Sequence, residues 1–470
     1  MERTSVAELA SMLRREVVRY SIGEKLPSSR ELVQRHQVSP VTVSRAISAL
    51  AAEGLVVARP GAGVFRAEPR RSAPAPGDTS WQEVALSAEA GLPPARSIDA
   101  SGVLTALALP PAEVIDLNSG YLHPSLQPEQ ALAGALARAG RRPGAWSRPP
   151  LEGLPELRAW FARDIAESVT AADVLIAAGG QSALTTALRS LAAPGAPVLV
   201  ESPTYPGMLA IARAAGLRPV PVPVDRDGLR TDLLAGAFAA SGARLLVCQP
   251  LFQNPTGTVL SAERRREVVR IARDAGAFVV EDDFARRLVH ADAPELPPPL
   301  AADDPDGVVV HIRSLTKATS PNLRVAALAA KGPALARLRA VQAVDSFFVP
   351  RPLQEAALEL VGSPGWPRHL KALGNALRER RTAAATALGG LAPARLPYGG
   401  YHLWLRLPEG TDPAAVAAAA LREGAAVTPG RGYFTAEPPG PHLRVGYACA
   451  ESPARITEGV HRLRRALGET

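Results

Sequence analysis

Short apolar segments alternate with helical segments over residues 174–343, and this alternation limits the possible folds more than any other feature of the sequence. The apolar segments are Val174–Ala177, Val198–Glu201, Leu245–Gln249, Ala277–Glu281, Val308–Ile312 and Ala326–Ala330. The helical segments between them are Ser182–Leu191, Met208–Ala215, Ala262–Asp274 and Ala334–Ala343. Alternation of this kind predicts an α/β domain with a mainly parallel sheet.

The first 66 residues follow a different, mainly helical pattern. Val6–Tyr20 places apolar residues on one helical stripe, and Ser28 followed by Glu31 has the spacing of a capping box at the start of a second helix. Ser39, which directly precedes a proline, predicts the start of a third helix. Residues 55–65 read as strand, glycine turn and strand. Three helices followed by a two-stranded wing are typical of a winged helix-turn-helix.

Between these two regions the chain is rich in Pro, Ala, Ser and Gly, which predicts a linker over residues 68–111. One short helix is expected within it, around Trp81–Ala90. The predicted organisation is therefore a winged helix-turn-helix over residues 1–67, the linker, and an α/β domain over residues 112–470. A chain of 470 residues has room for two or three such units.

The cysteine content and the N-terminus predict a cytoplasmic protein. Cys248 and Cys449 are the two cysteines, and neither belongs to a Cys-x-x-Cys pair, so neither a disulfide framework nor a metal site is expected. The N-terminus lacks the apolar core of a signal peptide. No apolar run approaches the roughly 18 residues of a membrane span, so no membrane partner is expected.

The basic charge is concentrated at the N-terminus. The whole chain has a formal net charge of +8, and residues 1–66 contribute +4 of it, from ten basic and six acidic residues. Half of the net charge thus lies in about a seventh of the chain, in the unit expected to be a winged helix. This distribution favours double-stranded DNA as the anionic partner.

Lysine is scarce, which narrows the candidates for any chemistry that needs an amine. Of 53 basic residues, 49 are arginines, and the lysines are Lys25, Lys317, Lys331 and Lys371. Lys317 is the only one of the four lysines that stands at the end of an apolar strand after a Ser-x-Thr run, Ser314-Leu315-Thr316. The alternative for a lone lysine is an ordinary solvated surface residue.

Three motifs around these strands identify a family. Asn254-Pro255-Thr256-Gly257, Glu281-Asp282-Asp283 and Ser314-Leu315-Thr316-Lys317 occur in the order and spacing of fold-type I aminotransferases, which use pyridoxal phosphate, and the resemblance covers about residues 112–465. The N-terminal unit resembles a GntR-type winged helix. Together they resemble the MocR subfamily of transcriptional regulators, which predicts a small winged helix-turn-helix joined to a large α/β domain of the fold-type I aminotransferase class.

The resemblance implies a role for each motif residue at the cofactor ring. Lys317 is expected to form the Schiff base, Asp282 to face the ring nitrogen, Asn254 to donate to the phenolic oxygen O3′, and Tyr205 to stack on the ring. The flanking acids of the Glu281-Asp282-Asp283 triplet compete for the aspartate role. Asn254 alone suits an Asn-Pro turn equally well, and a lone tyrosine is usually core.

The cofactor phosphate needs N–H donors and positive charge, which a glycine-rich turn at a helix N-terminus supplies. The expected phosphate contacts are Gly180, Gln181, Ser182, Ser314, Thr316 and Arg324. Arg444, in the run His442-Leu443-Arg444-Val445-Gly446, resembles the arginine that binds a substrate carboxylate, which its bidentate fork suits. In a chain with 49 arginines, a surface charge is the simpler interpretation of any one of them.

Two positions depart from the aminotransferase pattern. Phe284 stands where the family usually has a tyrosine that hydrogen-bonds O3′, and Gly180 stands where a serine is more usual. Both changes remove a hydroxyl that would contact the cofactor. They favour a protein that uses the cofactor to sense a ligand over one that uses it for efficient catalysis.

In the winged helix, the resemblance implies a set of DNA contacts: Arg30, Ser39, Thr42, Ser44, Arg45 and, in the wing, Gly63. Phosphate contacts would give affinity, and the recognition helix in the major groove would give specificity. Pro40 departs from the arginine common at its position, so the operator sequence cannot be carried over. The alternative for this unit is a protein-interaction module with a solvated basic face.

The expected function is that of a DNA-binding transcriptional regulator that senses pyridoxal phosphate, an amino acid or an amine, the last two as an external aldimine in place of Lys317. The resemblance also implies a homodimer. Two other classes remain open: a working aminotransferase that carries a DNA-binding unit, and an interaction scaffold whose cofactor fold has lost its cofactor.

Overall fold

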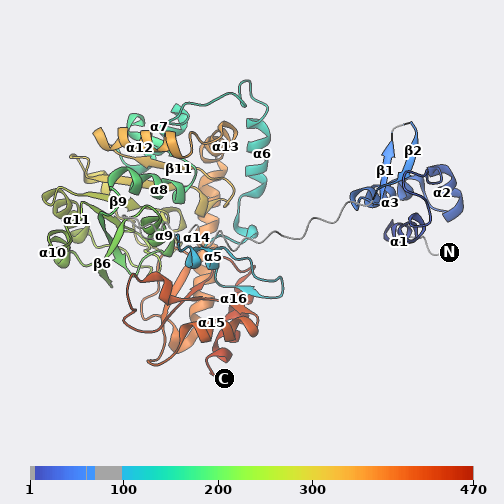
Figure 1. Cartoon of the computed structure of the whole chain (residues 1–470). Coiled ribbons are helices and arrows are strands. Elements are labelled where there is room, and N and C mark those ends of the chain that lie inside the picture. Colours follow the sequence, from blue (N-terminus) through green and yellow to red (C-terminus); the bar gives the residue numbers. More distant parts are fainter. Residues whose placement is uncertain (1–5, 60, 69–97, 469–470) are drawn as a thin grey trace. The chain divides into compact units, whose positions relative to one another are not determined.

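The computed structural model describes residues 6–59, 61–68 and 98–468 (Figure 1). The chain divides into two compact units, Met1–Ala88 and Glu89–Thr470. The short helix expected around Trp81–Ala90 lies outside the described residues. Within the described residues, no helix combines the length and apolar character that crossing a membrane requires.

The N-terminal unit has the predicted winged-helix plan. Its elements are α1 (Val6–Val17), α2 (Ser29–His36), α3 (Pro40–Ala52), β1 (Val56–Arg59) and β2 (Gly63–Arg66). The two strands pair antiparallel and form the wing. Leu9, Leu13, Leu32, Val43 and Leu50 are buried in one core between the three helices. The first helix ends at Val17 rather than Tyr20, and Tyr20 packs only partly against this core.

The helix starts in this unit follow from the residues predicted to cap them. The Ser28 hydroxyl accepts from the Glu31 backbone N–H, and the Glu31 carboxylate accepts from the Ser28 N–H, which completes the capping box. Ser39 accepts from the Thr42 N–H at 3.1 Å, and Pro40 occupies the first position of α3. Local sequence therefore fixes where α2 and α3 begin.

An eight-stranded sheet forms the centre of the large unit, in the order β4-β11-β10-β9-β8-β5-β6-β7. The strands are β4 (Val174–Ala177), β5 (Pro197–Ser202), β6 (Arg218–Asp225), β7 (Gly228–Leu229), β8 (Leu245–Cys248), β9 (Phe278–Asp282), β10 (Val309–Ser314) and β11 (Ala326–Ala329). The strands from β10 to β6 pair in parallel, whereas β11 and β7 pair antiparallel with their neighbours. The predicted mainly parallel sheet is confirmed, and all six predicted strands are present.

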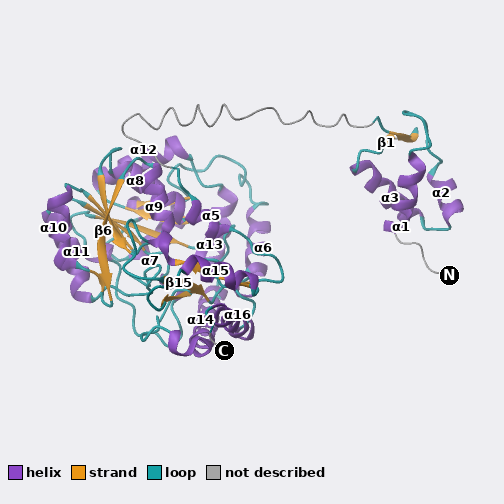
Figure 2. Cartoon of the chain, turned by 60° about the horizontal axis from the view of Figure 1, so that its bottom comes forward, coloured by secondary structure: helices purple, strands orange, loops and turns teal. Residues whose placement is uncertain are grey.

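Helices cover both faces of this sheet (Figure 2). They are α7 (Pro155–Ile165), α8 (Gly180–Leu191), α9 (Pro206–Ala214), α10 (Thr231–Ser241), α11 (Ala262–Asp274) and α12 (Gly332–Asp345). Consecutive strand residues point to opposite faces, so Leu175 packs with the core under α8, α9 and α12, whereas Ile176 packs with the core under α7, α10 and α11. Burial on both faces explains why the strands are continuous apolar runs.

The sequence interpretation missed β6, whose residues are Arg-Pro-Val-Pro-Val-Pro-Val-Asp. Pro219, Pro221 and Pro223 are spaced by two, so their missing N–H groups lie on one side of the strand, and the alternate residues remain able to donate to β5. The strand pairs with β5 over six residues and with β7 only at its end. Proline content alone therefore does not exclude a strand near a sheet edge.

Smaller sheets complete the large unit. β12 (His402–Arg406), β15 (His442–Gly446) and β14 (Thr428–Pro429) form one, and β3 (Ile115–Asp116) pairs with β13 (Ala425–Ala426) in another. The remaining α-helices are α6 (Glu129–Ala139), α13 (Arg351–Gly362), α14 (Gly365–Leu388), α15 (Pro413–Arg422) and α16 (Pro453–Ala466). This region brings Arg444, on β15, to the same side of the unit as the loop that follows β3.

A described helix, α5 (Ser101–Leu107), lies within the stretch predicted to be linker. It packs against α9 (Figure 1). A Cβ atom placed on Gly102 would lie 3.3 Å from the Pro206 Cβ, so the helices approach closely because Gly102 has no side chain. The predicted linker therefore contains, at its C-terminal end, a helix that packs with the large unit.

Candidate functional site

A cleft opens at the carboxyl ends of β8, β9 and β10, where the loops after parallel strands usually carry function. It encloses about 560 Å³ of space that protein atoms do not fill, part of it open to solvent. The residues that line it are Tyr121, Gly180, Gln181, Leu184, Tyr205, Gln249, Asn254, Asp282, Phe284, Ser314, Thr316, Lys317, Arg324 and Tyr401. Nine of these are among the ten residues predicted to bind the cofactor.

Lys317 lies in the short helix that follows β10, and its amine is held among aromatic rings. Its Nζ donates to the Gly120 carbonyl oxygen at 2.7 Å and lies 4.1 Å from the centre of the Tyr121 ring. Burial lowers the pKa of Lys317 to about 8, and the nearby Arg444 and Arg324 charges act in the same direction. A substantial fraction of this amine is therefore neutral, and so nucleophilic, near neutral pH.

Asp282 is joined to Asn254 through one glutamine. Gln249 donates from Nε2 to Asp282 Oδ2 at 2.7 Å, and its Oε1 accepts from the Asn254 backbone N–H at 3.0 Å. Burial raises the pKa of Asp282 to about 6. Asn254 Oδ1 is buried and has no hydrogen-bond partner among the described residues. Gln249 thus orients the Asp282 side chain and the Asn254 backbone, and the Asn254 side-chain oxygen remains free for a ligand.

The candidate phosphate cradle joins the start of α8 to the loop after β10. Gly179 has φ +85°, and a Cβ atom there would lie 2.6 Å from the guanidinium carbon of Arg324, so this position requires glycine. Thr316 Oγ1 is buried without a partner in the described part of the chain. Ser182 lies in the first turn of α8 but is not among the described residues that line the cleft.

Tyr205 directly precedes α9 and lies on the wall of the cleft. Its hydroxyl donates to Gln181 Oε1 at 3.2 Å. A Cβ atom on Gly207 would lie 2.3 Å from this ring, so the small residue at 207 makes room for it. The ring is therefore held in place beside the N-terminus of α8, as a stacking role requires.

Phe284 lines the cleft where a tyrosine was expected on family grounds, and Tyr401 packs edge-on against it at 6.1 Å between ring centres. Tyr401 also lies under Arg444, whose guanidinium carbon is 5.2 Å from the ring centre. The sequence interpretation did not select Tyr121, Gln249 or Tyr401. Gln249 was detectable in principle, because it is the last residue of one predicted strand and Asp282 directly follows the next predicted strand.

Arg444 is buried on β15, beside the cleft rather than among the residues that line it. Its Nη1 donates to the Asn118 carbonyl oxygen at 2.9 Å. Its Nε is buried and has no hydrogen-bond partner among the described residues. A buried guanidinium with a free donor and no carboxylate beside it is suited to bind an anionic ligand.

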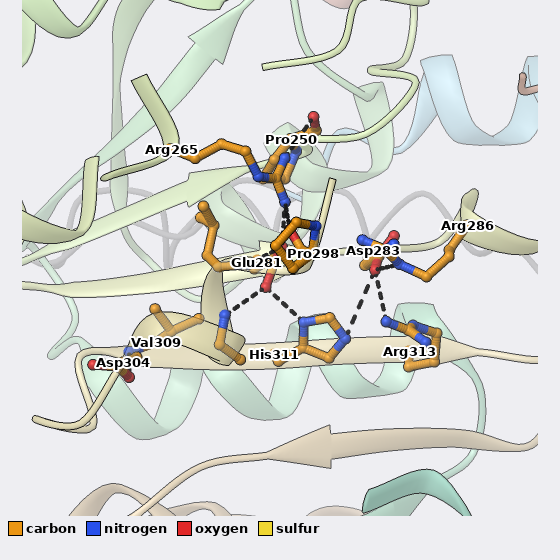
Figure 3. A network of polar contacts seen from close by, with 12 residues as sticks. Pro250, Arg265, Glu281, Asp283, Arg286, Pro298, Asp304, Val309, His311 and Arg313 are labelled. Carbon is orange, nitrogen blue, oxygen red and sulfur yellow. Dashed lines mark hydrogen bonds and ion pairs between the residues drawn. The ribbon is translucent and has the colours of Figure 1, made fainter. Parts of the chain in front are cut away.

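Glu281 and Asp283 take part in a separate ion network (Figure 3). Side chains alternate along β9, so these two acids point away from the Asp282 face. Asp283 accepts from Arg313 at 2.8 Å and from Arg286 at 2.5 Å, while His311 Nδ1 donates to Glu281 at 2.6 Å. This arrangement resolves the competition among the three acids, because Asp282 is the one that lines the cleft.

The same network explains the pKa values of its acids. Burial alone would raise the pKa of Asp283, but Arg313, Arg286 and His311 together hold it well below its usual range. The donor atoms of Glu281, Asp283 and His311 lie within 4.8 Å of one another, a spacing that a metal ion also allows. Guanidinium groups already supply the positive charge there.

The winged helix carries its predicted DNA contacts on and beside α2, α3 and the wing. Arg30, Ser44 and Arg45 are exposed, as contact with a phosphate or a base requires. The Ser39 hydroxyl caps α3 and lies 2.8 Å from the Thr42 hydroxyl. Gly63 has φ +118°, and a Cβ atom there would lie 2.6 Å from the Lys25 side chain, so the wing can close only over glycine.

A lysine-centred cleft at the carboxyl edge of a mainly parallel sheet defines the large unit as a domain of the fold-type I aminotransferase class. Sequence comparison agrees, since the family described as "Aminotransferase class I and II" matches residues 112–463. The family described as "Bacterial regulatory proteins, gntR family" matches residues 6–65.

Similar proteins include regulators and enzymes. The HTH-type transcriptional regulator YisV of Bacillus subtilis, itself uncharacterised, is 30% identical over 82% of this chain and 80% of its own. The 2-aminoadipate transaminase of Thermus thermophilus is 33% identical over 75% of this chain and 90% of its own. The solved α-aminoadipate aminotransferase LysN of T. thermophilus, complexed with N-(5′-phosphopyridoxyl)-L-leucine, superposes with a TM-score of 0.74 at 30% identity, covering 83% of this chain and 98% of LysN.

The chain belongs to the aminotransferase class I and II family and carries a gntR-family winged helix at its N-terminus, the combination found in the MocR subfamily. The fold implies pyridoxal phosphate as the cofactor of the large unit, and the winged helix implies DNA as a partner.

Proposed function

We propose that this chain is a transcriptional regulator whose winged helix binds operator DNA and whose large unit binds pyridoxal phosphate covalently through Lys317 and responds to an amino acid or amine. The observation that carries this proposal is the cleft itself. It joins a lysine with a pKa lowered to about 8, a buried aspartate and a glycine-lined helix N-terminus in one space.

The residues present fit the cofactor. Two buried oxygens, Asn254 Oδ1 and Thr316 Oγ1, lack partners among the described residues and stand ready for a polar ligand. Because Gly179 has no side chain, the Arg324 guanidinium lies against the turn before α8, where a phosphate would need a positive charge. The donor set is also appropriate, because a helix N-terminus, hydroxyls and a guanidinium together suit a dianion.

When bound, pyridoxal phosphate supplies an aldehyde and an electron-withdrawing ring. Lys317 provides the amine that attaches it. Asp282, which Gln249 orients, would pair with the ring nitrogen and hold its proton. Tyr205 would stack on the ring, and the start of α8 with Ser314, Thr316 and Arg324 would hold the phosphate.

Arg444 supports an effector that carries a carboxylate. It is the cation beside the cleft whose Nε is buried and unpartnered in the described structure, and a carboxylate can accept from Nε and Nη together. Phe284 removes the phenol that would tune the cofactor, which supports a sensing role over fast turnover. A ligand changes DNA affinity only through its different affinities for two arrangements of the protein.

On the DNA side, we propose that Arg30 and Arg45 contact phosphates and that Thr42 and Ser44 reach base edges from α3. Ser39 contributes mainly by capping this helix, since its hydroxyl already accepts from the Thr42 N–H. A homodimer would place two winged helices on two half-sites. Exposed large apolar side chains of the large unit, among them Trp146, Val344 and Phe347, are consistent with burial against a second copy.

The cofactor assignment is tested by absorption spectroscopy of purified Lys317→Ala protein. We expect the visible band of covalently bound cofactor to be absent in this variant and present in Lys371→Ala, a matched control at an exposed position of α14. A band that persists in Lys317→Ala would disprove the assignment. Binding to the DNA upstream of its own gene, measured by fluorescence anisotropy with and without cofactor and an amino-acid panel, tests the regulatory part.

A working aminotransferase is the second candidate function. The free Nε of Arg444 favours it, because a carboxylate-binding guanidinium beside a reactive lysine is also what a transaminase needs. Incubation of cofactor-loaded protein with amino acids and 2-oxo acids separates the two candidates. Product in large molar excess over protein supports an enzyme, and a spectral shift without turnover supports a sensor.

A further inference from the structure

Helix α5, which lies within the stretch predicted to be linker, contacts residues next to the cleft in two places. On one side Gly102 packs closely against Pro206, the first residue of α9, directly after Tyr205. On the other side the Thr105 carbonyl oxygen accepts from Asn118 Nδ2 at 3.0 Å. The first described helix after the winged-helix unit thus contacts a neighbour of Tyr205, which lines the cleft, and a hydrogen-bond partner of Arg444, which lies beside it.

Asn118 is the residue through which α5 reaches Arg444. Its backbone carbonyl accepts from Arg444 Nη1 at 2.9 Å, while its side-chain amide donates to α5. Its Oδ1 accepts from the hydroxyl of Thr428, which pairs with Arg444 across β14 and β15. Asn118 is 7% exposed, so water does not replace these bonds easily.

We infer that Asn118 couples occupation of Arg444 by a carboxylate to the position and stability of α5. This inference rests on the proposed function and specifies how the binding of a carboxylate at Arg444 affects α5. A carboxylate that accepts from the free Nε of Arg444 fixes the plane of the guanidinium and therefore the direction in which Nη1 meets the Asn118 carbonyl. Each polar group of Asn118 makes a hydrogen bond. A change in the bond to its carbonyl oxygen is therefore transmitted to Thr105 through its side-chain amide.

The coupling is specific to the carboxylate and not to filling of the cleft. A ligand without a carboxylate occupies the lysine and ring contacts but leaves Arg444 Nε unpartnered. A ligand that carries a carboxylate makes the lysine and ring contacts and also pairs with Arg444 Nε. Two ligands that differ only in this group therefore isolate the step.

The test uses the full-length chain freed of cofactor and two stable probes, N-(5′-phosphopyridoxyl)-L-leucine and N-(5′-phosphopyridoxyl)-3-methylbutylamine, which differ only by the carboxylate. Hydrogen–deuterium exchange is measured for peptides that contain Ser101–Leu107. We expect exchange in α5 to differ about fivefold or more between the two complexes. Equal exchange in α5 with both probes bound would overturn the inference, and this comparison needs no variant.

Two variants show whether Asn118 carries the effect. Asn118→Ala removes the amide that reaches α5 and keeps the backbone carbonyl, so we expect it to bind both probes without the difference in α5 exchange. Thr105→Ala is the matched control, because it removes the hydroxyl that donates to Ser101 and keeps the carbonyl that accepts from Asn118. It should retain the difference. A difference that persists in Asn118→Ala would overturn the role of this residue.

The same titrations separate this inference from the proposed function. If neither probe binds, the cofactor assignment fails and the inference fails with it. If both bind and α5 does not distinguish them, the cofactor site stands and the coupling is wrong.

Discussion

The acids of the Glu281-Asp282-Asp283 triplet lie on opposite faces at the end of strand β9, and they differ in their partners and in the direction of their pKa shifts. On one face, Glu281 and Asp283 pair with His311, Arg313 and Arg286, and Asp283 keeps a pKa well below its usual range. On the other face, Asp282 holds one described side-chain partner, Gln249, and burial raises its pKa to about 6. Adjacent acids thus differ in their partners, and of the three Asp282 alone lines the cleft.

The difference extends to the surroundings of each face. The cleft contains groups that titrate near neutral pH, since burial raises the pKa of Asp282 to about 6 and lowers that of Lys317 to about 8. It also contains buried oxygens without partners among the described residues. The ion network also has buried polar atoms without described partners, among them Asp283 Oδ1 and Arg313 Nε. The guanidinium partners of Asp283, rather than unpaired polar atoms or acidity, therefore distinguish the network from the candidate site.

The largest effect is expected on the network face. Asp283→Ala leaves Arg313 and Arg286 without their shared carboxylate, which should lower the free energy of unfolding of the large unit by about 3–5 kcal/mol. Asp282→Ala, the matched change on the cleft face, should cost about 1 kcal/mol or less, because it removes one hydrogen bond. Urea denaturation followed by circular dichroism measures both. Equal losses would contradict the division between the two faces.

The second effect concerns pH and Lys317. The amine reacts in its neutral form, so the rate of covalent cofactor capture should rise roughly tenfold per pH unit up to a pKa of about 8 and then level off. Between pH 6 and pH 8 the gain is about fiftyfold, because half of the amine is neutral at its pKa. Stopped-flow absorbance measures it, with Nα-acetyl-lysine as a control whose rate should keep rising to about pH 10. A protein rate that also rises to that pH would disprove the lowered pKa.

The third effect is a loss of cofactor affinity in Asp282→Asn. A hydrogen bond to a charged group contributes about 1.5–3 kcal/mol, so affinity should fall about ten- to a hundredfold without loss of the fold. Equilibrium dialysis against pyridoxal phosphate gives the affinity. Glu201→Gln serves as control, since it replaces a buried carboxyl that bonds Gln249 and Gln253 without lining the cleft. Unchanged affinity in Asp282→Asn would show that its charge does not face the ring.

The smallest effect is a gain in Gly180→Ser. A Cβ atom at Gly180 would lie 3.7 Å from the Ser314 Cβ, an ordinary contact, so the added hydroxyl fits beside the phosphate. One more hydrogen bond to a phosphate that already has several donors should contribute about 1 kcal/mol, which predicts about fivefold tighter binding. Gly179→Ser is the contrasting variant, with φ +85° and a Cβ atom 2.6 Å from the Arg324 guanidinium. It should bind cofactor more weakly, and the same dialysis tests both.

Much of the fold and site could be predicted because the signals are local. Ser28 and Glu31 form a capping box over three residues, and the apolar strand runs carry their own evidence of burial on both sheet faces. Lys317 stood out because lysine is scarce and because a motif precedes it. Asp282 was selected from three acids by resemblance, and strand alternation gives the physical reason for that choice.

The features that could not be predicted depend on contacts between distant segments. β6 forms despite its prolines because β5 supplies a partner ladder, and α5 forms where composition suggested linker because α9 offers a surface. Tyr401 and Asn118 carry no motif. They matter because folding brings residues near 118, 317, 401 and 444 to one place.

The sequence by itself determined the two-unit plan, the parallel sheet, the helix starts and the candidate for the reactive lysine. These depend on periodicity, capping and short motifs, which act over a few residues. Only the tertiary structure decided which of the buried acids pair with guanidinium groups and which one lines the cleft, and that α5 meets Arg444 through Asn118. Burial and hydrogen-bond partnership are properties of the packed chain, because they depend on segments that meet only when the whole unit folds.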